Sequence, residues 1–191
     1  MIHKTWANAK VAHDDLNAQI RDNIGMLLNP PACRRTGASD SYTTSAEGWA
    51  IVTWDLDGKG SGGYSSFDTT GGVMPEHSYS ITIPVDGLYE IQWGALITYP
   101  TAPAATAAYA QASVSLNNMT SFTTPSLGRV SLGRSTSTER NGSGVTTAPL
   151  KAGDYLCLGV SADGAAFQVG NSATGRQNTF LEARWVGEYP A

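Results

Sequence analysis

The sequence predicts an all-β domain, and three observations support this prediction. Charged residues make up only 15 % of the 191 residues, whereas 21 residues are glycine, and this balance favours short strands and turns over long helices. Apolar and polar residues alternate in about eight or nine short segments. Glycine, proline, asparagine or serine separates these segments, without helices between them. The pattern is typical of a β-sandwich, usually the eight-stranded jelly roll, with a barrel as the alternative.

The predicted core residues follow the two-residue period of a strand. In the longest segment, residues 88–97, Tyr89, Ile91, Trp93, Ala95 and Ile97 fall on one face. The other segments add Val52, Trp54, Leu56, Tyr79, Ile81, Ile83, Ala110, Ala112, Val114, Leu116, Val130, Leu132, Leu156, Leu158, Val160, Leu181, Ala183 and Trp185. Small polar residues on the opposite face, Gln111, Ser113 and Ser115, are expected to face solvent or a sister subunit.

The N-terminal residues differ from the rest of the chain. Residues 1–11 have no clear period and carry a lone Trp6, as in an extended arm. Residues 13–28 have a helical pattern, with acidic residues in the first turn and Pro30 and Pro31 as the stop. We therefore predict residues 1–31 as an arm and amphipathic helix, and residues 32–191 as one jelly-roll domain that is long enough to bury its own core.

The helix carries one apolar stripe. Leu16, Ile20, Asn23 and Leu27 repeat in steps of four, three and four, and Ile24 lies beside them. The stripe either packs on the chain's own β domain or forms a short symmetric bundle in which Asn23 fixes the register. A helix of this length is marginal alone, so it must pack against something. We favour self-association, and expect residues 1–31 to serve attachment and trimerisation.

Composition and motifs argue against several functions. The net charge of -4 and the lack of a basic cluster exclude a nucleic-acid footprint, and no apolar run is long enough to be inserted into a membrane. The three histidines are scattered, and no Gly-x-Ser-x-Gly motif occurs. Residues 58–63 match Gly-x-Gly-x-x-Gly but precede a strand. We expect no enzyme and no cofactor.

Metal and disulfide chemistry are equally unsupported by the sequence. Asp55 and Asp57 resemble the opening of a calcium loop, but the later oxygen ligands are missing, so we expect no metal site. The two cysteines, Cys33 and Cys157, do not imply a disulfide framework. Cys157 lies in an apolar strand and is predicted to be a small core residue.

Two predicted loops are candidates for recognition, because exposed loops on a rigid sandwich commonly bind ligands. Residues 99–106 begin with Tyr99 and include Pro100 and Pro103. Residues 136–143 include Glu139, Arg140 and Asn141. Plain connections between strands are the alternative interpretation. If the loops do bind, a host cell-surface glycan is the expected ligand.

Segments along nearly the whole chain resemble known families. Residues 11–24 (VAHDDLNAQIRDNI) and 28–33 (LNPPAC) resemble the N-terminal signature of small virion proteins, often labelled minor tail proteins, in phages of actinobacteria. The body is similar to the trimeric jelly rolls of the tumour necrosis factor and complement globular-head superfamily. The segments that carry this second resemblance are 85–89 (VDGLY), 148–156 (APLKAGDYL) and 179–187 (TFLEARWVG).

The resemblance implies a homotrimer on the outside of a bacteriophage particle, synthesised in the host cytoplasm and located in the virion. Its partners would be copies of itself and other virion proteins of the tail or capsid. A minor tail protein is the first expectation. The alternatives are a capsid decoration protein and a host cell-surface adhesin. Such modules occur both at the tail tip and on the capsid surface, so the resemblance does not decide the location.

Overall fold

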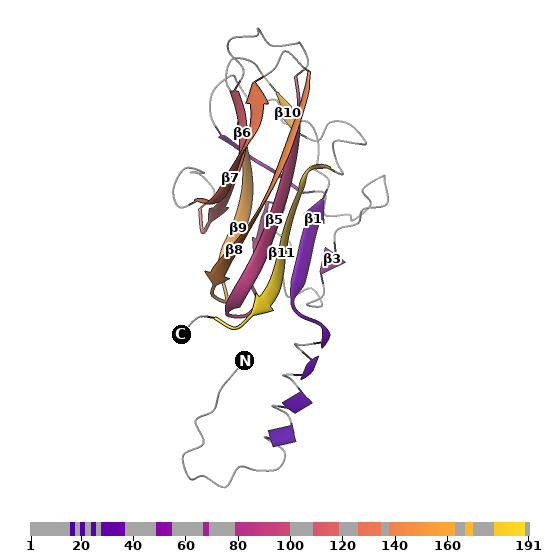
Figure 1. The fold of residues 1–191 in the computed structure, drawn as a ribbon, viewed down its shortest axis with the longest axis vertical. Coiled ribbons are helices and arrows are strands. Elements are labelled where there is room, and N and C mark those ends of the chain that lie inside the picture. The colour runs from indigo at the N-terminus through magenta and orange to yellow at the C-terminus, as the bar shows by residue number, and fades with distance from the viewer. Residues whose placement is uncertain are drawn as a thin grey trace.

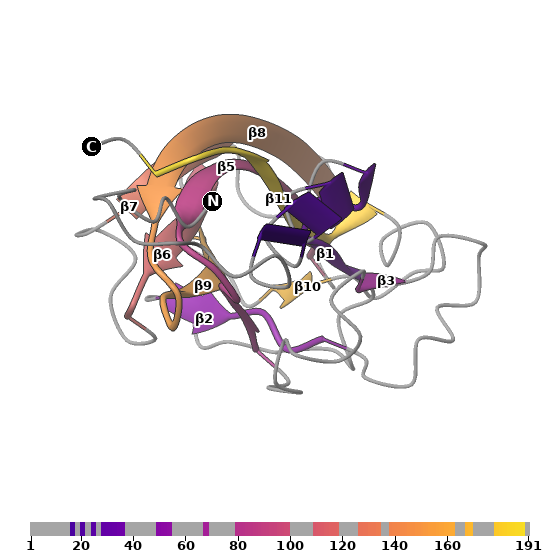
Figure 2. The ribbon, with the colours of Figure 1, turned by 90° about the horizontal axis from the view of Figure 1, so that it is seen from below.

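The computed structural model describes residues 16–17, 20–21, 24–25, 28–36, 49–54, 67–68, 79–99, 109–118, 126–134, 138–162, 167–169 and 178–189. Within them the chain forms two antiparallel sheets that face each other (Figures 1 and 2). Sheet I contains β1 (Ala32–Thr36), β3 (Phe67–Asp68), β5 (Gly87–Thr98), β8 (Glu139–Leu150), β10 (Gln168–Val169) and β11 (Phe180–Gly187). Sheet II contains β2 (Trp49–Ile51), β4 (Ser80–Thr82), β6 (Tyr109–Leu116), β7 (Ser126–Arg134) and β9 (Tyr155–Ala162).

Strand β5 organises sheet I, because it has partners along both edges. Strand β8 pairs with it over its full length, from Gly87 to Thr98. On the other edge β11 pairs with residues 88–94, and β10 takes over at Ile97 and Thr98. At the change of partner, the Leu96 N–H donates to the Thr179 hydroxyl at 3.1 Å. Just before this change of partner, Gly94 pairs with Phe180, the first residue of β11.

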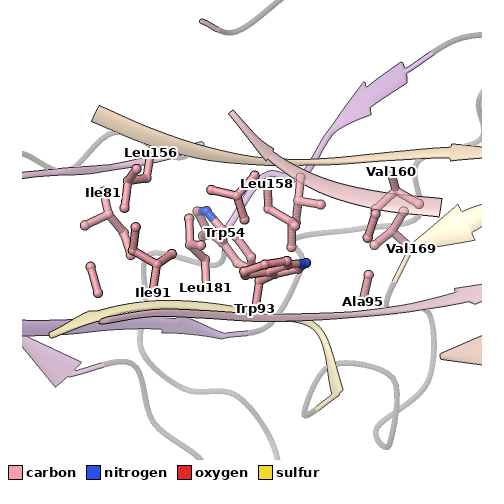
Figure 3. Packing of buried hydrophobic residues seen from close by; sticks show 14 of the residues in the cluster. Trp54, Ile81, Ile91, Trp93, Ala95, Leu156, Leu158, Val160, Val169 and Leu181 are labelled. Atoms are coloured by element: carbon pink, nitrogen blue, oxygen red, sulfur yellow. The ribbon is translucent and has the colours of Figure 1, made fainter. Parts of the chain in front are cut away.

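The core lies between the two sheets, as the alternating pattern predicts. Figure 3 shows Trp54, Trp93 and Leu158 packed together between the layers. All five residues predicted for the inner face of β5 are buried. The predicted core residues of β6, β9 and β11 are also buried, except Leu116, which is partly buried. The jelly-roll sandwich predicted from the sequence is therefore confirmed.

Both cysteines belong to the interior. Cys33 on β1 and Cys157 on β9 are buried free thiols on different sheets. Burial raises the pKa of the Cys157 thiol to about 12, because the thiolate would lose its hydration. The prediction of Cys157 as a small core residue is thus confirmed.

Two expectations about placement are wrong. Ser113 and Ser115, expected to face solvent or a sister subunit, are buried within the chain. The Ser113 hydroxyl is 2.8 Å from the Ser126 hydroxyl, and the Ser115 hydroxyl donates to the Asn118 carbonyl, so their polar groups are satisfied internally. The loop expected at residues 136–143 is mostly a strand, because β8 begins at Glu139 and pairs with β5 from that residue onward.

The N-terminal helix lies outside the sandwich. All described residues between positions 16 and 28 are helical, and the Asn29 N–H donates to the Gly25 carbonyl at 2.9 Å. Pro30 and Pro31 follow, and β1 begins immediately afterwards at Ala32. Figure 1 shows these helical pieces beyond one end of the sandwich, below β1. The helix therefore projects from the end at which β8 and β11 finish.

Candidate functional site

The first candidate site is the exposed stripe of the N-terminal helix. Leu16, Ile20, Ile24 and Leu28 are exposed by 39 %, 50 %, 49 % and 73 %. Their spacing of four residues places neighbours on the same side of a helix. These four side chains are therefore available for contact with a partner in the chain on its own. Of the other residues predicted for attachment, Trp6, Asn23 and Leu27 lie outside the described residues.

The second candidate site is the outer face of sheet I. Residues paired across antiparallel strands project to the same face, so the register defines rows on this surface. One row contains Ser143 on β8, Gly94 on β5 and Phe180 on β11. The next contains Val145, Gln92, Glu182 and Arg34. Small and polar side chains thus cover most of this face, and Val145 is exposed by 63 %.

Two charged residues on this face, Arg34 on β1 and Glu182 on β11, form an ion pair. The Arg34 Nη1 atom lies 3.0 Å from the Glu182 Oε2 atom. The same guanidinium covers the Phe180 ring, with its Cζ atom 4.4 Å from the ring centroid. One cation therefore fixes both a carboxylate and an aromatic ring. These contacts hold Phe180 in place beside the middle of β5.

A hollow lies on the same face, next to Phe180. It has a cavity volume of about 230 Å³ and is lined by Asn141, Gly142, Ser143, Asn178 and Phe180. Gly94 lies in the row between Ser143 and Phe180 and contributes no side chain to fill the space. A Cβ atom on Gly94 would lie 2.6 Å from Phe180 Cε1 and 2.9 Å from the Asn178 carbonyl oxygen. The glycine therefore lets the Phe180 ring lie close over the β5 backbone.

The residues predicted for recognition have different roles. Tyr99 and Arg140 are exposed by only 1 % and 5 %. The Arg140 Cζ atom is 4.9 Å from the Tyr99 ring centroid, and Nη1 donates to the Gly133 carbonyl at 2.9 Å. The expectation that both lie in exposed loops is therefore wrong, and they pack against each other inside the protein.

The remaining residues predicted for recognition differ in where they lie. Glu139 and Asn141 are exposed, but on strand β8 rather than in a loop, and only Asn141 lines the hollow. Pro100 and Pro103 lie outside the described residues. Sequence reasoning missed Asn178 and Phe180. The available signal was the alternation of the closing segment, which places Phe180 on the outer face because Leu181 points inward.

The described part of the chain has neither a metal-binding cluster nor a membrane-spanning helix. No group of three or more His, Cys, Asp or Glu residues there is arranged to hold a metal ion. The Asp55 and Asp57 pair lies outside the described residues. Among the described helical residues, no helix has both the length and the apolar character that crossing a membrane requires.

Comparison with known proteins identifies the fold. No known protein-family model matches the chain, and no curated protein matches it significantly. Among solved structures, the crystal structure of murine APRIL at pH 5.0 superimposes with a TM-score of 0.55 at 13 % sequence identity. The match covers 82 % of this chain and 98 % of the APRIL chain. The chain therefore has a jelly-roll fold similar to that of the tumour necrosis factor family.

Proposed function

We propose that this protein is a non-enzymatic structural subunit of a bacteriophage virion: a homotrimer on the particle surface, and specifically a minor tail protein. The observation that carries the proposal is the helix of exposed aliphatic residues that projects from one end of a jelly-roll body. An attachment segment joined to a stable body is what a virion subunit needs. Residues 11–24 and 28–33 resemble phage virion proteins, and this resemblance is the reason for proposing a bacteriophage particle.

The exposed helix favours a partner outside the chain. Leu16, Ile20 and Ile24 remain substantially exposed when the chain is alone, and burying an aliphatic side chain contributes roughly 1.5–3 kcal/mol. Three such residues on each helix, repeated by cyclic symmetry, provide a small apolar core. The same stripe also suits docking onto another virion protein. In either case the helix becomes stable through its partner rather than through its own propensity.

The homotrimer has a second line of support. The family that the fold resembles consists of trimeric jelly rolls, which is consistent with self-association. Closed cyclic symmetry is also the usual arrangement of soluble homo-oligomers. Light scattering on the purified chain should therefore report about three times the chain mass of 20.1 kDa. A stable monomer at micromolar concentration would refute the trimer.

Particle composition tests the virion proposal directly. A phage lacking this gene would be complemented in the host with either the full chain or residues 32–191. Mass spectrometry of purified particles should find the full chain and should not find the shortened one. If neither version enters particles, the virion proposal fails. If the shortened chain enters at full occupancy, the β domain carries attachment and the helix does not.

Cryo-electron microscopy of the same particles tests the location. Density for the trimer on the tail supports a minor tail protein. Density at the lattice axes of the capsid would replace that assignment with a capsid decoration protein. A host-surface adhesin, the other alternative, is favoured by one separate observation, the hollow beside Phe180, which is considered next.

A further inference from the structure

We propose that the hollow between β8 and β11 is a binding site for a neutral saccharide. It is formed by features that lie far apart in the sequence and meet only through strand pairing. Asn141 and Ser143 lie near the start of β8, whereas Phe180 is the first residue of β11 and Asn178 lies two residues before it. Gly94, between them on β5, has no side chain, which lets the Phe180 ring lie close over the β5 backbone and form one wall of the hollow.

The chemistry of the lining selects the class of ligand. None of the five lining residues carries a charge. Close to Phe180, Arg34 and Glu182 are paired with each other, and Glu139 is exposed on β8 two residues before Asn141. Side-chain amides and a hydroxyl can both donate and accept hydrogen bonds, as saccharide hydroxyls require. Because Arg34 covers the Phe180 ring and the β5 backbone lies close to it, the ring offers its remaining edge as an apolar surface for a sugar ring. An anion or a cation would find no opposite charge in the lining.

The size of the hollow limits the ligand further. A volume of about 230 Å³ lies below the roughly 300–1,000 Å³ of sites that enclose drug-sized molecules. One pyranose or furanose ring is therefore the expected unit, with the rest of a longer glycan outside. A shallow, open site of this kind predicts weak affinity for a single sugar, with a Kd of roughly 1 mM or higher.

The position of the hollow suits recognition of an external glycan. Strands β8 and β11 both begin at the end of the sandwich opposite the N-terminal helix, and their arrowheads point toward the helix (Figure 1). A protein held by its helix would present this end outward. The saccharide site itself does not depend on the proposed virion role, because it rests on the lining residues alone.

Saturation-transfer NMR on the full-length chain tests the site with defined probes: glucose, galactose, mannose, arabinose and N-acetylglucosamine, with glucuronate as the anionic comparison. We expect saturation transfer to at least one neutral sugar, and little transfer to glucuronate. The absence of transfer to all five neutral sugars would overturn the proposal. Stronger transfer to glucuronate than to any of them would also overturn it, because the lining offers no cation.

Variants of residues on β8 and β11 test whether the sugar binds in the hollow. The double variant Asn141→Ala, Ser143→Ala should weaken binding by about tenfold or more, since both hydrogen-bonding groups are lost. Phe180→Leu, which keeps an apolar side chain but removes the ring, should also weaken it. Thr147→Ala is the matched control, because Thr147 is exposed on the same strand and face but outside the hollow.

Each variant would first be compared with the wild type for its melting temperature, so that loss of binding is not confused with unfolding. Because Asn141 and Ser143 are exposed, their replacement should leave that temperature unchanged. If the double variant binds as well as the wild type, or if Thr147→Ala loses binding equally, the site is not the hollow. Failure here would leave particle incorporation unaffected, so the two proposals are separable.

Discussion

At the scale of single residues, the Trp93 ring occupies space that neighbouring glycines leave open. A Cβ atom on Gly144, its partner on β8, would lie 2.3 Å from Trp93 Cζ2. A Cβ atom on Gly128, from sheet II, would lie 2.2 Å from Trp93 Cη2. The indole therefore fits between the sheets only because both positions lack a side chain.

The first prediction concerns Gly144→Ala. The added methyl group should lower the free energy of unfolding by about 1–3 kcal/mol, because the Trp93 ring cannot move without disturbing the core. Urea unfolding measures the change. In a Trp93→Phe background, where the second ring is missing, the same substitution should cost clearly less. Equal costs in the two backgrounds would show that the indole is not what the methyl group meets.

The second prediction concerns Tyr89, whose hydroxyl donates to the Val85 carbonyl at 2.9 Å. Burial raises the pKa of this phenol from 10.0 to about 12, because the phenolate would lose its hydration. The unfolded chain therefore ionises from about pH 10, whereas the folded chain keeps its proton until about pH 12. Stability should fall as the pH rises through this window.

Tyr89→Phe tests both effects. At pH 7 it should lose about 0.5–1.5 kcal/mol, the usual contribution of one internal hydrogen bond. Between pH 10 and 12 its stability should fall less steeply than that of the wild type, since the titrating group is gone. Urea unfolding at a series of pH values measures both. Parallel pH curves for the two proteins would contradict a perturbed phenol at this position.

At the scale of elements, we expect the N-terminal helix to contribute to assembly rather than to the stability of the body. The third prediction is that replacing Leu16, Ile20 and Ile24 together by Ser abolishes the trimer. The free energy of unfolding of the β domain should change by no more than about 0.5 kcal/mol, because these side chains are exposed within one chain. Sedimentation velocity and urea unfolding measure the two properties.

The control for this variant replaces exposed polar residues of the same helix, Asn17→Ser and Arg21→Ser. Helix propensity changes in both proteins, but only the triple variant loses the apolar stripe. The control should stay trimeric. If the triple variant is also trimeric, the β domain alone holds the subunits together.

The strands also show which parts of the structure the sequence could predict. Alternation identified the inner face of β5 correctly, because a two-residue period maps directly onto one buried side. It failed for β8, where Asn141, Gly142 and Ser143 resemble a loop in composition. These residues form a strand because β5 offers a long partner edge, which local sequence does not encode. Long-range pairing with β5, not local composition, therefore determines that these residues form a strand.

The candidate site was predictable only in part, for the same reason. The helix stripe is local, so Leu16, Ile20 and Ile24 could be selected from their spacing. The hollow joins Asn141 to Phe180 across β5, and only the register of three strands brings them together. Arg140 was selected because its segment was predicted to be an exposed loop, but it is buried against Tyr99. A Gly- and Ser-rich segment was thus a poor indicator of exposure.

At the scale of the whole molecule, the β domain holds the complete described core. The buried cluster extends from Cys33 to Trp185 and includes no residue of the helix. The fourth prediction is that residues 32–191 fold alone, with one cooperative urea transition and an unfolding free energy within about 1 kcal/mol of that of the monomeric full chain. A molten state that binds hydrophobic dyes would show that the N-terminal segment is needed for folding.

The pairing of β1 with β11 has a consequence for synthesis. Strand β1 directly follows the helix, but its ladder runs from Ala32 opposite Arg184 to Thr36 opposite Phe180. Among the described strands β1 is made first and β11 last, so β1 can pair early with β3, whereas its pairing with β11 must wait until residues 180–184 have been made. Such non-local pairing is slow to form. We therefore expect the β1–β11 edge of sheet I to form late in folding, after most of the β domain has been synthesised.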